Sequence, residues 1–93
     1  MEPEIAWSAE KNDELKERYG FGFERILIAL AEGAPLDNRS HSHRDRYGHQ
    51  RQLIVDIDSH AWIVPFVQDE QTIFLKTMFP SRKATKTYLE PSR

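Results

Sequence analysis

Three consecutive stretches with apolar residues at every second position constrain the fold of this chain most strongly. The stretches are residues 53–57, 62–66 and 73–77, and the segments between them have the length of hairpin links. A period of two places alternate side chains on one face of a strand. The pattern therefore predicts three antiparallel strands in a row, with one apolar face that needs another layer of structure against it.

Two helices are predicted before these strands. Ser8 is a good N-cap for a first helix over residues 9–19, and Gly20 is placed to end it. The apolar stripe of this helix is thin, so we expect it to be largely exposed. The second helix has a stronger apolar face, with five residues at helical spacing: Phe23, Ile26, Leu27, Leu30 and Ala31.

A short strand over residues 4–7, a long polar loop over 33–49 and a basic helix over 82–89 complete the predicted order. Pro65 lacks the N–H group that a strand donates, so we expect it at a sheet edge or a bulge. The order predicts a single α+β domain over residues 1–93. In it, two N-terminal helices pack on an antiparallel sheet of three to four strands, followed by a short C-terminal helix.

The composition excludes several classes of protein. The 93 residues include no cysteine, so a disulfide scaffold, a thiolate nucleophile and a cysteine zinc site are excluded, and packing alone must hold the fold. No apolar run approaches the roughly 20 residues of a membrane span. The acidic start, with Glu2 and Glu4, is unlike a signal peptide. We therefore expect a cytoplasmic protein with no membrane partner.

Charge is distributed unevenly along the chain, although the formal net charge is only −2. Residues 37–51 carry four arginines against two aspartates, and residues 76–93 carry five bases against Glu90 alone. The segment between them, residues 52–75, is acidic. Two basic segments on an otherwise acidic chain indicate a local anion site, provided that the fold brings them together.

The first basic segment admits three interpretations. His41, His43 and His49 offer metal ligands, but the arginines of the same segment oppose a bound cation, and we predict no metal. A solvated polar loop is the second interpretation. The third is a phosphate-binding surface, on which Arg44 and Arg46 contact an anion and a histidine transfers a proton.

Within this segment His41 is the histidine expected to matter most. It follows Asp37 by four residues and precedes Tyr47, so a carboxylate can orient its ring while a phenol shares the proton. His43 and His49 are expected to contribute little. Tyr47 lies among arginines and histidines, which leaves base stacking, proton transfer and packing all open for it.

The second basic segment combines Lys76 with a helix that Ser81 can cap and that carries Arg82, Lys83 and Lys86. Cations near a helix start favour an anion, although cations that merely keep a helix soluble are the plainer alternative. RNA cleavage without a metal needs a base for the 2′-hydroxyl, cations for the phosphorane and an acid for the leaving oxygen. The two basic segments together offer such groups.

Five short motifs follow one another along the chain: residues 7–12 (Trp-Ser-Ala-Glu-Lys-Asn), Gly20 with Phe23, His41 with Tyr47 and Gln50, the Val-Pro-Phe-Val run at 64–67, and residues 81–84 (Ser-Arg-Lys-Ala) with Tyr88. Their order and spacing resemble the BrnT family of bacterial type II toxin–antitoxin modules, within the RelE-like toxins. The resemblance covers residues 5–89. Two positions depart from the family pattern, because Ser8 replaces the usual aspartate and Tyr19 replaces the histidine before glycine.

The resemblance implies a RelE-like fold and a ribonuclease activity that arrests translation. It also implies a cognate antitoxin that neutralises the toxin, and contact with operator DNA only through the antitoxin complex. No cofactor is predicted. The residues predicted to act in catalysis are His41, Tyr47, Lys76 and Arg82, and those predicted to bind RNA are Arg44, Arg46, Arg82, Lys83 and Lys86.

Two other classes of function remain open at this point. One is a RelE-like domain that binds a protein partner or nucleic acid without cutting RNA. The other is a metal-dependent enzyme built on His41, His43 and His49.

Overall fold

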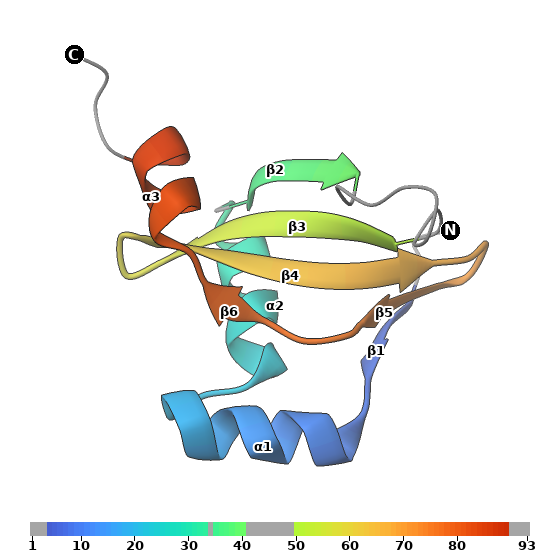
Figure 1. Ribbon diagram of the computed structural model, residues 1–93. Coiled ribbons are helices and arrows are strands. Elements are labelled where there is room, and N and C mark those ends of the chain that lie inside the picture. The colour runs from blue at the N-terminus through green and yellow to red at the C-terminus, as the bar shows by residue number, and fades with distance from the viewer. Residues whose placement is uncertain (1–3, 34, 41–49, 90–93) are drawn as a thin grey trace.

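The structure is a computed structural model, and it describes residues 4–33, 35–40 and 50–89. These residues form three helices and a mixed sheet of six strands, which confirms the predicted α+β class (Figure 1). The elements in chain order are β1 (Glu4–Trp7), α1 (Ala9–Tyr19), α2 (Phe23–Ala31), β2 (Pro35–Ser40), β3 (Gln50–Ile57), β4 (His60–Gln68), β5 (Thr72–Leu75), β6 (Phe79–Pro80) and α3 (Arg82–Tyr88). None of the described helices is long and apolar enough to cross a membrane.

The sheet has more strands than predicted, and it is mixed. Its order is β1-β5-β4-β3-β2, and β6 pairs with β4 outside this path. The strands β2 to β6 pair antiparallel, but β1 runs parallel to β5. The prediction of an antiparallel sheet with three to four strands is therefore wrong in both strand number and strand direction.

The strand β2 lies where the sequence predicted a polar loop. It pairs antiparallel with β3, with Asn38 opposite Leu53. The guanidinium of Arg51 reinforces this pair, because its Nε donates to the Asn38 side-chain oxygen at 2.8 Å and its Nη2 donates to the Asn38 carbonyl at 3.1 Å. Asp37 and Asn38 are exposed. Backbone pairing at the end of a sheet needs no apolar period, so the prediction of a loop over these residues was wrong.

The helices begin and end largely as their sequence signals predict. Ser8 caps α1 by accepting a hydrogen bond from the Lys11 backbone N–H at 3.2 Å, and Gly20 ends it in a left-handed conformation with φ of 85°. The helix is mostly exposed, as expected, although Asn12 and Leu15 are buried. No sequence signal indicated that a polar residue of α1 would be buried.

Two clusters of buried residues form the core. The larger cluster contains residues of α1, α2 and the sheet: Leu15, Phe23, Ile26, Ala29, Val55, Ile57, Trp62, Val64, Phe66, Leu75 and Met78. Trp62 and Phe66, which lie at alternate positions of the apolar stretch 62–66, are thus core residues. A smaller cluster of Ile54, Ala61, Ile63 and Ala84 joins the sheet to α3. Figure 1 shows α3 at the upper left, at the height of β2, and α1 at the bottom, below the strands.

Pro65 is buried within β4, away from the sheet edge. Its carbonyl accepts a hydrogen bond from the Lys76 backbone N–H at 2.8 Å. The nitrogen and carbonyl of one residue point to the same side of an antiparallel strand, so the Pro65 nitrogen also faces the segment around Lys76. This segment lies between β5 and β6, where the strand pairing is interrupted. Between these two pairings, residues 64 and 65 of β4 lie opposite the three residues 76–78, so Pro65 lies in a central strand opposite a bulge. The bulge that the sequence predicted as one alternative is present, and the other alternative, a sheet edge, is wrong.

Candidate functional site

Two hydrogen bonds join the start of α3 to the start of β4, and a third, within α3, supports them. The Ser81 backbone N–H donates to the Ala61 carbonyl at 3.0 Å, and the Ala61 N–H donates to the Thr85 hydroxyl at 2.9 Å. The same hydroxyl donates to the Ser81 carbonyl at 2.7 Å. Ser81 also caps α3 by accepting from the Ala84 N–H at 3.1 Å, as predicted. The residues on either side of these contacts are therefore held in fixed relative positions.

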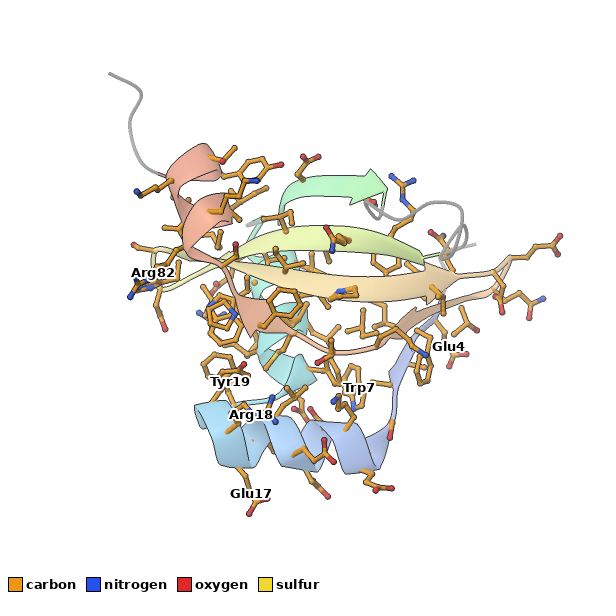
Figure 2. All side chains as sticks on the ribbon, in the orientation of Figure 1. Glu4, Trp7, Glu17, Arg18, Tyr19 and Arg82 are labelled. Carbon is orange, nitrogen blue, oxygen red and sulfur yellow. The ribbon has the colours of Figure 1, made fainter. Side chains whose placement is uncertain are left out.

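A groove of about 550 Å³ lies at this junction, and its lining residues are His60, Pro80, Ser81, Arg82, Thr85 and Lys86. Arg82 and Lys86 are both exposed and lie four residues apart on α3, so they share one face of the helix. The lining includes no carboxylate among the residues that the structure describes. Figure 2 shows Arg82 beside the turn between β3 and β4, at the same end of the molecule as Tyr19.

A second, smaller hollow adjoins the basic groove. It measures about 240 Å³ and is lined by Phe21, Ile57, Asp58, His60, Trp62 and Pro80. Its wall is stiffened by ring contacts, since Phe21 and Tyr19 each pack on Trp62 with ring centroids 5.1 and 5.0 Å apart. His60 and Pro80 line both cavities. A basic groove and a largely apolar hollow thus share one boundary.

The turn that carries His60 has an unusual backbone. Asp58 and Ser59 both take positive φ angles, 52° and 67°, in the two-residue link between β3 and β4. A two-residue hairpin turn with both φ angles positive usually contains glycine or asparagine. The Asp56 carboxylate supports the turn by accepting from the Ser59 N–H at 3.0 Å. His60 is exposed, and its Nδ1 lies 3.1 Å from the Asp58 carbonyl oxygen.

The groove gathers only part of the predicted site. Arg82 and Lys86 line it, whereas Lys83 is exposed on α3 and is not among the lining residues. Lys76 is exposed beyond the end of β5, with its Nζ 5.7 Å from the centre of the Phe74 ring. Its backbone N–H donates to the Pro65 carbonyl, whereas α3 meets β4 at Ala61. Pro65 and Ala61 are four residues apart in the strand, a distance of roughly 13 Å. The structure therefore does not bring Lys76 to the lining of the groove.

The remaining predicted site residues, His41, Arg44, Arg46 and Tyr47, lie outside the described residues, as do His43 and His49. Their roles stay predictions. In the part of the chain that the structure describes, no three histidine, aspartate or glutamate side chains form a group that could hold a metal ion.

His60 is a residue of the groove that the sequence does not predict, because it stands alone between two strands and far from the basic helix in the chain. Its position beside Arg82 depends on the contacts of Ala61 with Ser81 and Thr85, which connect distant parts of the chain. No local pattern of residue types reveals such contacts.

Comparison of the chain with models of known protein families, with curated proteins and with solved structures finds no match. The function is therefore inferred from the groove and from the sequence motifs.

Proposed function

We propose that this chain is the toxin of a type II toxin–antitoxin module, a metal-independent ribonuclease that arrests translation and is neutralised by a cognate antitoxin. The observation that carries the proposal is the groove in which Arg82, Lys86 and His60 lie together beside an apolar hollow. Operator DNA is bound only through the antitoxin complex, and the protein acts in the cytoplasm.

The chemistry of the groove suits a phosphodiester. Arg82 offers planar paired donors and Lys86 a compact positive charge, and both groups bind phosphate oxygens. Cations at this position also stabilise the extra negative charge that a phosphorane acquires during RNA cleavage. The adjoining hollow, with Phe21 and Trp62 in its wall, offers an apolar surface to an unpaired base.

The motifs that resemble the BrnT family support the same proposal. Two of them begin with a serine, and both serines cap a helix: Ser8 at the start of α1 and Ser81 at the start of α3. Arg82 of the second motif lines the groove. The RelE-like arrangement is part of the proposal, supported by the larger buried cluster that includes residues of α1, α2 and the sheet.

A binding module that does not cut RNA is the second candidate. Arg82, Lys86 and the hydroxyl groups of Ser81 and Thr85 in the groove are groups that hold a phosphate without acting on it. This candidate shares the groove and its ligand with the ribonuclease and differs only in the outcome for the RNA.

Incubation of the purified protein with total RNA, with and without EDTA, tests the proposal. We expect cleavage in both conditions. Binding without cleavage would identify the binding module, and cleavage that EDTA abolishes would identify a metal-dependent enzyme. A protein that neither binds nor cleaves RNA would contradict both the ribonuclease and the RNA-binding module.

A further inference from the structure

His60 is placed between the two cavities. It lines the basic groove together with Arg82 and Lys86, and it lines the apolar hollow together with Phe21 and Trp62. In a ribonucleotide the ribose connects the base to the phosphate. A nucleotide with its phosphate in the groove and its base in the hollow therefore has its ribose beside His60.

The position of His60 relative to Arg82 is fixed by the backbone. His60 immediately precedes Ala61, and Arg82 immediately follows Ser81. The Ser81 N–H donates to the Ala61 carbonyl at 3.0 Å, and Thr85 bonds to both residues. The imidazole and the guanidinium are thus presented from two elements joined directly at their starts, and such preorganisation is what proton transfer at a bound phosphate requires.

The contact at Nδ1 determines which ring nitrogen of the neutral His60 carries the proton. The Asp58 carbonyl oxygen lies 3.1 Å from Nδ1, and a carbonyl only accepts hydrogen bonds. The neutral imidazole therefore carries its proton on Nδ1 and donates it to this oxygen. This leaves a lone pair on Nε2, the form that a general base needs.

We propose that His60 is the general base of the ribonuclease, acting on the ribose 2′-hydroxyl of an RNA whose phosphate is held by Arg82 and Lys86. The inference rests on the proposed function. Nε2 takes the 2′-hydroxyl proton as the 2′-oxygen forms a bond to phosphorus. The bond from phosphorus to the 5′-oxygen breaks, and that oxygen leaves with the bonding pair and takes a proton from water. The products are a 2′,3′-cyclic phosphate and a 5′-hydroxyl, and the imidazolium returns its proton to the hydroxide that remains.

The test compares RNA cleavage and RNA binding by the wild type and by His60→Gln. Glutamine keeps a polar side chain of similar reach but cannot take up a proton at neutral pH. General acid–base catalysis contributes about 10²- to 10⁴-fold in rate, so we expect His60→Gln to slow cleavage by a factor in that range. RNA affinity, measured by filter binding, should stay within about threefold, because Arg82 and Lys86 remain. His43→Gln is the matched control, since the same substitution at a histidine predicted to contribute little should leave the rate within tenfold.

A second variant separates chemistry from structure. His60→Ala should regain cleavage when free imidazole is added, whereas Arg82→Ala should not. Unchanged cleavage by His60→Gln in an active protein would overturn the role of His60 and leave the ribonuclease proposal standing, as would equal losses of binding and cleavage without rescue by imidazole. A wild type that cleaves no RNA would overturn both proposals.

Discussion

At the scale of single residues, the buried Asn12 connects α1 to the start of α2 by hydrogen bonds. It is 5% exposed, and its side chain takes the place of an N-cap for α2, where Gly22 offers no side chain. The Asn12 Oδ1 accepts from the Phe23 N–H at 2.7 Å, and its Nδ2 donates to the Glu24 carboxylate at 2.9 Å. A Cβ at Gly22 would lie 2.1 Å from Asn12 Oδ1, so only glycine leaves room for this contact.

The Glu24 carboxylate is stabilised as an anion at the same place. A hydrogen bond from its own backbone N–H is the main cause that lowers the pKa of Glu24 below its ordinary value of 4.5, and Asn12 and Lys16 act in the same direction. Lys16 Nζ lies 3.4 Å from this carboxylate, but both side chains are about half exposed, so solvent screens the pair. Side chains of α1 thereby stabilise the first turn of α2.

We predict that Asn12→Ala lowers the free energy of unfolding by about 1–3 kcal/mol, because it leaves the buried Phe23 N–H without an acceptor. Asp13→Ala is the control on the same helix, since Asp13 is exposed and its removal should change stability by less than about 0.5 kcal/mol. Urea unfolding of the purified variants measures both effects. Equal stability of Asn12→Ala and the wild type would show that this cap contributes nothing.

At the scale of elements, the local signals predicted α1, α2 and the three main strands because each has an apolar period or a recognisable cap. The strand β2 could not be predicted in this way, since its exposed residues Asp37 and Asn38 are polar and it is held by backbone pairing with β3. The parallel pairing of β1 with β5 joins two segments that lie far apart in the chain. Such pairing depends on the whole topology and leaves no mark in either segment.

A single substitution in the turn between β3 and β4 should raise the stability of the protein. Ser59 has φ of 67°, a conformation that costs a residue with a Cβ roughly 1–2 kcal/mol and costs glycine little. Ser59→Gly should therefore raise the free energy of unfolding by about 1 kcal/mol, while the Ser59 N–H contact with Asp56 is kept. Ser40→Gly, in the extended strand β2, is the comparison and should destabilise the protein. A Ser59→Gly variant less stable than the wild type would contradict the assignment of this turn.

At the scale of the whole molecule, the sequence predicted that two basic segments form one anion site, and the groove contains part of the second segment. Arg82 and Lys86 were predicted because charge runs are visible in a sequence. The place of His60 in the groove could not be predicted, and neither could the position of Lys76 away from the groove lining. Both depend on how α3 docks against β4. The cationic residues of the site could therefore be predicted from the sequence, but which residues lie together could be seen only in the fold.

The groove also predicts how an antitoxin acts. An acidic or amphipathic segment of the antitoxin that covers Arg82, Lys83 and Lys86 would neutralise their charge and exclude RNA from the groove at once. We expect the purified complex to cleave no RNA, and charge reversal at Lys83 and Lys86 to weaken the complex and to make its affinity less dependent on salt. Full ribonuclease activity in the intact complex would contradict this arrangement.

The central claim is that this groove acts on RNA in the cell, and growth arrest by Arg82→Ala tests it most directly. Arg82 is exposed at the start of α3 and no stabilising contact of its side chain is apparent among the described residues, so the variant should fold with unchanged stability. The control is Arg18→Ala, which removes an exposed arginine from α1 that lines neither cavity. At matched expression, the account predicts that the wild type and Arg18→Ala arrest growth and that Arg82→Ala does not. Growth arrest by a folded Arg82→Ala protein as strong as that of the wild type would contradict the account.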